Sequence, residues 1–189
     1  MVNSVRDIGK QALEAAYDQY AATGSLSMRQ IGTALNVSAP ALYHHFTNKQ
    51  ALIDAVAERG FTLFKSRLRT IEATKPRKII YEILSHYVDF AIEQPSLFGL
   101  MFVARRPGTH QFPRDFADHR SAVFDLLWKA VDQRVSKRKP DPDLSLHLAH
   151  DLWALTHGQI LLWRAGQFED DRTFREVLAK SIERFIDTI

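Results

Sequence analysis

The sequence contains no cysteine among its 189 residues. This absence excludes disulfide bonds, thiolate metal sites and cysteine nucleophiles. The chain also lacks a run of roughly 18 apolar residues, the length that a membrane-spanning helix needs, and its first residues lack the apolar core of a signal peptide. We therefore expect a cytoplasmic protein that has no membrane partner.

Sequence signatures of catalysis are missing as well. The chain has no glycine-rich phosphate loop and no distinctive arrangement of Ser, His and Asp. We accordingly predict no catalytic residues, no cofactor and no enzymatic activity. The net charge of +3 permits an anionic partner without requiring one.

Apolar residues make up 46% of the chain and recur at helical spacing almost throughout. No segment alternates strongly enough to predict a strand, so the expected fold is all-α with about nine helices. The expected helices span approximately residues 4–22, 28–35, 38–45, 47–74, 76–93, 95–104, 113–136, 142–165 and 170–188. Residues 137–143 are expected to form an exposed loop.

Three residue pairs at the expected helix starts carry the side chains of N-terminal capping pairs. They are Ser4 with Asp7, Ser27 with Gln30, and Thr47 with Gln50. Ser38 is expected to cap the third helix, whose first turn contains Pro40, where a missing N–H costs little. Asn36 stands where the chain must turn sharply, and Asn tolerates the left-handed conformation better than most residues.

The helices at 27–35 and 38–45 are short and are joined by a tight turn. This is the plan of a helix-turn-helix, whose second helix lies in the DNA major groove. Gly32 is expected where the helices cross closely. The side chains expected to form the small core between them are Ile31, Leu35, Val37, Leu42 and Phe46.

The segment LSMRQIGTALNVSAPALYHHFTNKQALIDAVAE resembles the DNA-binding region of the tetracycline-repressor (TetR) family of bacterial regulators. The matching positions are Arg29, Ile31, Leu35, Val37-Ser38, the run Leu42-Tyr43-x-His45-Phe46, and Lys49-x-x-Leu52. Gly32 stands where the family usually has Ala, and Asn36 where it usually has Gly. The resemblance implies a DNA-binding domain at residues 1–50 and a helical regulatory domain at residues 51–189. It further implies a repressor that a small hydrophobic or aromatic effector releases from a palindromic operator.

The resemblance also implies which residues contact double-stranded DNA. They are Ser27, Arg29, Ser38, Ala39, Pro40, Ala41, Tyr43, His44, His45 and Lys49. Arg29 is expected to contact bases or phosphate, and a bidentate Arg suits guanine. Tyr43 and Lys49 are expected to contact phosphate. The two histidines either contact the groove or pack against the first helix, and the alanines and proline offer only apolar contact, for example with thymine methyl groups.

For the regulatory domain the resemblance implies an unidentified effector in a mainly apolar cavity. The expected contacts are Tyr87, Met101, Phe102, Trp128, Trp153 and His157. His157 and Tyr87 are the expected polar contacts, because an apolar pocket needs few of them to fix orientation. A fully packed core is the alternative. His147, His150 and Asp151 lie at helical spacings to His157, but we favour hydrogen-bonded histidines over a metal site and predict no metal.

The last two helices are expected to form a homodimer interface. The helix at 142–165 is apolar nearly all round, through Leu148, Leu152, Leu155, Ile160, Leu161 and Leu162. It therefore needs cover on two sides. The helix at 170–188 has a second stripe through Phe174, Leu178, Ile182, Phe185 and Ile189. By the family resemblance, two such helices from each subunit form a four-helix interface.

Two other functions remain open at this point. An effector-independent DNA-scaffolding protein would share the helix-turn-helix but have no defined cavity. A helical enzyme or ligand carrier is disfavoured by the missing catalytic signatures.

Overall fold

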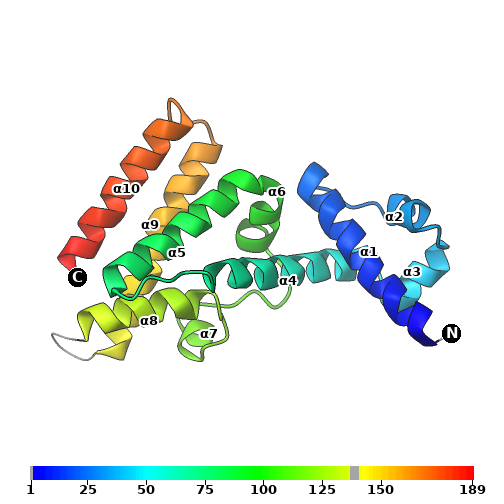
Figure 1. Ribbon diagram of the computed structural model, residues 1–189, viewed down its shortest axis with the longest axis horizontal. Coiled ribbons are helices and arrows are strands. Elements are labelled where there is room, and N and C mark those ends of the chain that lie inside the picture. Colours follow the sequence, from blue (N-terminus) through cyan, green and yellow to red (C-terminus); the bar gives the residue numbers. More distant parts are fainter. Residues whose placement is uncertain (1, 137–140) are drawn as a thin grey trace. The chain divides into compact units, whose positions relative to one another are not determined.

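The structure, a computed structural model, describes residues 2–136 and 141–189, with side chains described from residue 8 onward. Within these residues every regular element is a helix, which confirms the all-α prediction (Figure 1). The elements are α1 (Val2–Thr23), α2 (Met28–Leu35), α3 (Ala39–His45), α4 (Lys49–Leu68), α5 (Pro76–Glu93), α6 (Pro95–Phe98), the π-helical turn η1 (Gly99–Val103), α7 (Arg114–Ala117), α8 (Phe124–Val135), α9 (Pro142–Arg164) and α10 (Asp171–Thr188). The side chains of the expected Ser4–Asp7 pair lie outside the described parts, as do residues 137–140 of the loop expected at 137–143. The last two residues of that expected loop, Pro142 and Asp143, belong to α9, which Asp141 caps. None of the described helices combines the length and the hydrophobicity of a membrane span.

Packing divides the chain into two compact units. Unit 1 comprises Met1–Phe64 and Ile92–Gly108, and unit 2 comprises Lys65–Ala91 and Thr109–Ile189. These units are defined by which parts of the chain pack together. The division into a DNA-binding domain at residues 1–50 and a regulatory domain at residues 51–189 stays a prediction.

In unit 1, α1 packs against both α2 and α3. α1 ends before Gly24, which adopts the left-handed conformation (φ 67°) that favours glycine. The Ser27 hydroxyl accepts a hydrogen bond from the Gln30 N–H at 3.3 Å, as predicted for an N-cap. The other half of the predicted capping box is wrong: the Ser27 N–H donates to the side-chain oxygen of Gln19 on α1, at 2.7 Å. The Gln19 amide in turn donates to the Gln30 side chain, so α1 fixes the start of α2.

The turn between α2 and α3 has the predicted left-handed residue. Asn36 has φ 53° and ψ 43°, and its N–H donates to carbonyls of the last turn of α2. The Val37 N–H donates to the Gly32 carbonyl at 2.9 Å. A Cβ on Gly32 would lie 3.1 Å from the Val37 carbonyl oxygen, so the missing side chain lets the turn fold back onto α2. The side chain of Leu42 is fully buried and packs beside Gly32, which holds α3 against α2.

The fourth helix differs from its prediction at both ends. Asn48 rather than Thr47 caps α4, because the Asn48 side chain accepts the Ala51 N–H at 2.8 Å. Gln50 bonds within α4 to Asp54 instead of completing a capping box. The helix ends at Leu68, several residues before the predicted end near Thr74. The Thr70 hydroxyl donates to the Arg67 carbonyl, a local bond that competes with continued helix.

The single helix predicted at 113–136 is wrong, because the chain forms α7 and then, after a break, α8. Between them His119 takes a positive φ of 56°, which ends the helical path. Asp115, buried at 4% exposure, accepts the Gln111 N–H at 2.8 Å and an Arg120 N–H at 2.9 Å. These bonds, with a further one from Arg114, lower the pKa of Asp115 to about 2.

The segment predicted as a helix at 95–104 begins as α6 and continues as the π-helical turn η1. In unit 1 this segment packs on α1 and on α4. A Cβ on Gly60 of α4 would lie 2.5 Å from the sulfur of Met101, so the glycine makes room for this side chain.

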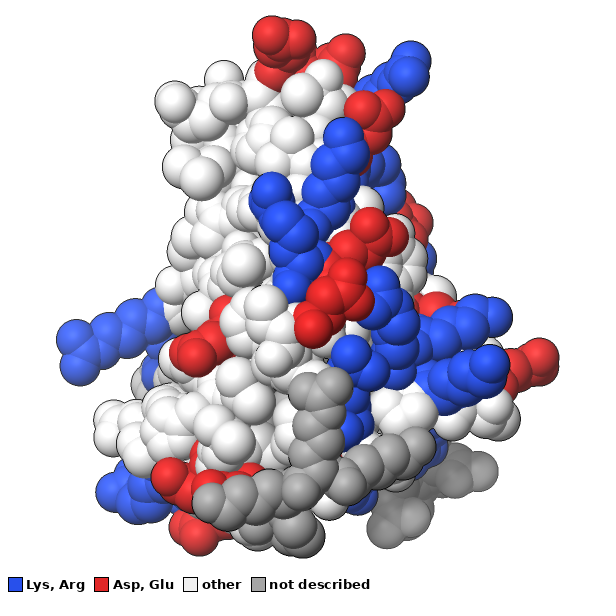
Figure 2. Space-filling model, turned by 90° about the vertical axis from the view of Figure 1, so that its left-hand side faces the viewer, with Lys and Arg blue, Asp and Glu red and all other residues white. Residues whose placement is uncertain are grey.

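In unit 2, α9 packs against α8 and α10. Ion pairs also tie α10 to α5, between Arg175 and Asp89 at 2.7 Å and between Arg77 and Asp187. On the face shown in Figure 2, Lys and Arg side chains are interspersed with Asp and Glu. This pattern fits surface ion pairs rather than a nucleic-acid surface.

Most of the apolar stripe of α10 faces its own chain. Phe174, Leu178 and Ile182 are buried within the protomer, whereas Phe185 and Ile189 are half-buried. The three buried residues therefore contribute to the core of unit 2, in contrast to their expected place at a subunit interface. On α9, by comparison, Leu161 and Leu162 remain exposed.

Candidate functional site

The outward face of α3 is the first candidate site. Leu42 marks the inner side of this short helix, because its side chain is fully buried. Ala39, Pro40, Tyr43 and His44 are exposed on the opposite side. The face is rigidly presented, since the Ser38 hydroxyl caps one end of α3 and the Phe46 N–H bonds back to Leu42 at the other.

A surface hollow of about 710 Å³ lies between α2 and α3. Its lining residues are Met28, Arg29, Gly32, Thr33, Asn36, Val37, Ser38, Ala39 and Tyr43. The predicted contacts Arg29, Ser38, Ala39 and Tyr43 are thus brought together around one depression. Thr33 was missed by the sequence analysis, although its position one turn after the exposed Arg29 is a signal that could have found it.

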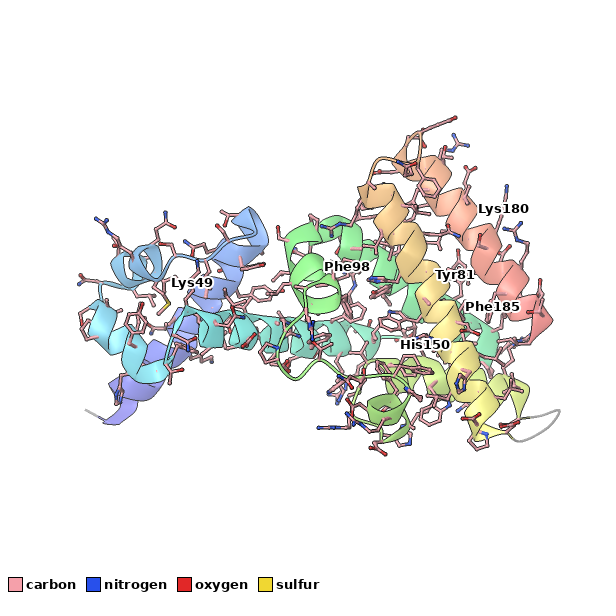
Figure 3. The ribbon with its side chains drawn as sticks, turned by 180° about the vertical axis from the view of Figure 1, so that it is seen from behind. Lys49, Tyr81, Phe98, His150, Lys180 and Phe185 are labelled. Atoms are coloured by element: carbon pink, nitrogen blue, oxygen red, sulfur yellow. The ribbon has the colours of Figure 1, made fainter. Side chains whose placement is uncertain are left out.

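Other predicted DNA contacts lie at the edges of this face. His45 is half-buried, and a Cβ on Gly9 of α1 would lie 3.0 Å from its ring nitrogen Nδ1. His45 therefore packs against the first helix, which was one of the two alternatives for it. Ala41 is half-buried as well. Lys49 is exposed at the first position of α4 (Figure 3).

Ser27 and Ser38 use their hydroxyl oxygens as acceptors for the caps of α2 and α3. A hydroxyl that accepts such a bond still has its own proton to donate. Both side chains therefore remain able to donate to a phosphate oxygen, and of the two only Ser38 lines the hollow.

A second candidate site lies in unit 2, between α5 and α9. The buried Tyr87 hydroxyl and His157 Nδ1 are 2.7 Å apart, and the Trp153 ring lies 5.8 Å from the His157 ring. Burial raises the pKa of Tyr87, so its hydroxyl remains protonated. Burial, with a smaller effect of the Arg164 charge, lowers the pKa of His157. The neutral imidazole and the tyrosine hydroxyl therefore share a hydrogen bond in a mainly aromatic environment, and the histidine tautomer decides which of the two donates.

The remaining predicted effector contacts have other neighbours. Met101 packs on Gly60 in unit 1, and Phe102 makes ring contacts with Phe61, Phe64 and Phe98. Trp128 donates its indole N–H to Ser145 at 2.9 Å and stacks against His119.

The histidines of α9 have aromatic and backbone neighbours. The His150 ring, labelled in Figure 3, stacks on Phe112 with ring centres 3.9 Å apart. His147 Nδ1 lies 2.9 Å from the Asp143 carbonyl oxygen. Across the described residues, no group of three or more His, Asp or Glu side chains is placed to hold a metal ion.

Comparison with known protein families matches both parts of the chain. Residues 12–56 match the model of the bacterial regulatory proteins of the tetR family, and residues 80–189 match that of the tetracyclin repressor-like C-terminal domain. The curated proteins contain no significant match.

Solved structures with the same fold span nearly the whole chain. A protein of unknown function from Rhodococcus sp. RHA1 is 26% identical, with a TM-score of 0.77 and coverage of 96% of this chain and 95% of the other. A TetR variant from Acinetobacter baumannii AYE, solved in complex with minocycline, is 19% identical, with a TM-score of 0.65 and coverage of 94% and 93%. NalD of Pseudomonas aeruginosa, the secondary repressor of the MexAB-OprM multidrug efflux pump, is 18% identical, with a TM-score of 0.58 and coverage of 96% of both chains.

The burial of His157 predicts how stability depends on pH. The pKa of His157 is lowered on folding from its ordinary value of 6.5, so the unfolded chain takes up this proton first as the pH falls. The free energy of unfolding should therefore be highest above pH 6.5 and should decrease as the pH falls toward the lowered pKa.

Urea denaturation at a series of pH values measures this slope. His157→Gln should flatten it, because glutamine has no proton to take up over this pH range. An equal slope in wild type and His157→Gln would contradict the assignment.

Proposed function

Because the chain belongs to the tetracycline-repressor family of bacterial regulatory proteins, we propose that it is a repressor that a small hydrophobic or aromatic effector releases from a palindromic operator. Family members are DNA-binding transcriptional regulators. The observation that carries the proposal for this chain is the exposed face of α3 beside the hollow lined by Arg29 and Tyr43. This face suits a helix lying in the major groove, with cationic and hydroxyl groups at the flanks for phosphate.

Binding as a homodimer explains recognition of a palindrome. Two copies of α3 related by a two-fold axis contact half-sites about one helical turn, roughly 34–36 Å, apart. α4 begins directly after the helix-turn-helix, so a shift of α4 changes the spacing of the two recognition helices. An effector acts on this spacing only to the extent that it binds one conformation more tightly than the other.

Operator binding should depend on the three polar residues in different ways. Tyr43→Phe and Lys49→Ala should each weaken binding by a similar factor for all sequences, because phosphate contacts carry no sequence information. Arg29→Ala should also relax the preference at one base pair, by roughly 1–3 kcal/mol if its contact is a bidentate one to guanine.

The measurement is a selection from random duplexes, followed by affinity titrations at several salt concentrations. Affinity should fall steeply with salt, and the fall should be shallower for Lys49→Ala. Lys180→Ala, which removes an exposed lysine of α10 in unit 2, is the matched control and should change nothing (Figure 3). Recovery of no enriched symmetric site would refute the operator proposal.

The exposed side of α9 supports dimerisation through that helix. Leu161 and Leu162 are 37% and 51% exposed, and Val177 of α10 is 40% exposed. Gly158 on α9 has no atom within 4 Å of where its Cβ would stand, so this side is open to another helix. Exposed leucines next to an open glycine suit the close approach of a second copy.

Leu162→Asp should convert a dimer into a monomer, because it places a charge at the centre of an apolar contact. Sedimentation or light scattering at micromolar concentration measures the mass. Val103→Asp is the matched control, because Val103 is as exposed as Leu162, at 51%, but belongs to unit 1. The Val103→Asp protein should remain a dimer. A wild-type monomer at this concentration would contradict the proposal.

The effector proposal rests on the cluster of Tyr87, Trp153 and His157. An aromatic wall with a neutral hydrogen-bonding pair suits an uncharged ligand with an aromatic or apolar body. Trp128, also in unit 2, stays part of the proposal as a further contact, and Met101 and Phe102 of unit 1 stay predictions from the sequence.

Thermal denaturation against a panel of hydrophobic and aromatic metabolites should identify a stabilising compound. At 100 times its dissociation constant, it should add about 2.7 kcal/mol of stability and release DNA. Trp153→Ala should blunt both responses without changing DNA affinity, whereas Trp163→Ala on the same helix should retain them. If no compound stabilises the protein or releases DNA, the effector-independent scaffolding function is favoured instead.

A further inference from the structure

Two helices of unit 2 are joined by a chain of hydrogen bonds through one tyrosine. Trp153 and His157 lie one turn apart on α9, and Tyr87 belongs to α5. The indole N–H of Trp153 bonds to the hydroxyl of Tyr87. The same hydroxyl lies 2.7 Å from Nδ1 of His157. The tyrosine oxygen is therefore the middle of a three-residue chain, and each end of that chain restricts the other.

The chain has a direction, because an indole nitrogen can donate a hydrogen bond but cannot accept one. Tyr87 must accept from Trp153, so its own proton can be donated to His157. A separation of 2.7 Å is usual for a hydroxyl donor, whereas an N–H donor most often lies about 2.9–3.0 Å from an oxygen. If Nδ1 carried the proton, two N–H groups would donate to one phenol oxygen. The tyrosine therefore donates to Nδ1, and the neutral imidazole carries its proton on Nε2.

The same chain opposes a charged histidine. An imidazolium has a proton on both ring nitrogens, so it would reverse the direction of the Tyr87–His157 bond. Burial and the Arg164 charge also lower the pKa of His157. At neutral pH the Nε2 side of the ring is thus an uncharged N–H donor. A ligand that meets this side of the ring has to supply a hydrogen-bond acceptor.

Aromatic rings surround the chain on the Trp153 side. The centres of the Phe116, Phe124 and His150 rings lie 6.1, 6.2 and 5.9 Å from that of Trp153. Phe116 and Phe124 are buried, but Trp153, His150 and His157 are only half-buried, so a flat apolar molecule can reach their rings. This wall suits the aromatic body of a ligand.

Among common acceptor groups, a carbonyl group suits this environment best. A carboxylate would bring a charge to the aromatic wall, which is costly unless a cation pairs with it. The imidazolium that could pair with it is the form that the bond to Tyr87 opposes. A hydroxyl group also accepts, but it brings a proton that needs a partner of its own. The oxygen of a ketone, aldehyde or quinone is uncharged and only accepts.

We propose that, if this cluster is the effector site proposed above, the chain fixes His157 as the Nε2–H tautomer and the effector is an uncharged aromatic carbonyl compound. The ring of the effector packs on Trp153, and its carbonyl oxygen accepts a hydrogen bond from Nε2 of His157. Tyr87 is a positioning residue, because it sets which nitrogen of His157 donates.

Nitrogen NMR of the isotope-labelled protein tests the tautomer without any ligand. The two ring nitrogens of a neutral imidazole have widely separated shifts, which reveal the nitrogen that carries the proton. We expect the Nε2–H pattern for His157 at pH values above 6.5, the ordinary histidine pKa. The signals missing from the spectrum of His157→Gln identify this residue. An Nδ1–H pattern in the wild-type protein would overturn the inference.

Tyr87→Phe removes the hydroxyl that donates to Nδ1 and keeps the ring. Without this hydroxyl, the His157 signals should move toward the average of the two tautomers. Tyr81→Phe is the matched control, because Tyr81 lies on the same helix and is 38% exposed (Figure 3). It should leave the His157 signals where they are. An unchanged Nε2–H pattern in Tyr87→Phe would contradict the positioning role, since a merely structural residue would alter stability alone.

Three small probes test the ligand class. Acetophenone and ethylbenzene have nearly the same shape and differ in the carbonyl oxygen, and benzoate has a carboxylate in place of the ketone. Acetophenone should shift the Nε2–H signal of His157 and should bind more tightly than benzoate. Its preference over ethylbenzene should be about two- to tenfold larger in the wild-type protein than in His157→Phe, the range expected for one neutral hydrogen bond. Comparing the two ratios cancels the different hydrophobicities of the probes.

The outcomes distinguish this inference from the effector function on which it rests. Absent binding of acetophenone, tighter binding of benzoate, or an equal preference in wild type and His157→Phe overturns the ligand class. The effector function still stands in that case if another compound of the panel described above stabilises the protein and releases DNA. If no compound of the panel does so, both are overturned. The Nε2–H tautomer, together with a preference for acetophenone that depends on His157, supports the inference.

Discussion

The close packing of α3 against α2 is the constraint on which the proposed DNA-binding face of α3 depends. A helix of seven residues is too short to be stable alone, so its shape comes from its neighbours. Gly32 and Asn36 make the tight turn possible, and the buried Leu42 anchors the helix that follows. Glycine within a helix lowers helix stability by roughly 1 kcal/mol relative to alanine. At Gly32 this loss is offset because the Val37 carbonyl can approach the helix closely where a side chain would otherwise stand. The same packing fixes which side of α3 is exposed.

In unit 2 several polar side chains lie inside the helical core, and each has a hydrogen-bond partner there. Tyr87 and His157 satisfy each other as a neutral pair, which avoids the cost of burying a charge. Asp115 is buried as a charged group, but backbone and guanidinium donors surround its carboxylate. The neutral pair fits a site for an uncharged ligand. The paired carboxylate fits a structural role, because it holds the break between α7 and α8.

Features that depend on neighbouring residues in the sequence could be predicted well. The caps by Ser27 and Ser38 and the left-handed Asn36 follow from side-chain chemistry over three or four residues. Features that depend on distant partners could not. Gln19 replaces Gln30 as the acceptor for the Ser27 N–H because α1 lies alongside, and the break after α7 depends on a carboxylate buried against Arg120. Helical periodicity continues through that break, so the pattern alone predicted one helix.

The sequence by itself determined the helical periods, the caps by Ser27 and Ser38 and the family resemblance, because each of these depends on local spacing. The tertiary structure decided which face of each helix is covered. On α10 the stripe through Phe174 and Leu178 turned inward to its own chain, while Leu162 on α9 stayed exposed. On α3 it placed Ala39 outside and set His45 against α1. Periodicity fixes where residues lie relative to one another around one helix, but the choice of partner for each face is made by packing between helices that are distant in the chain.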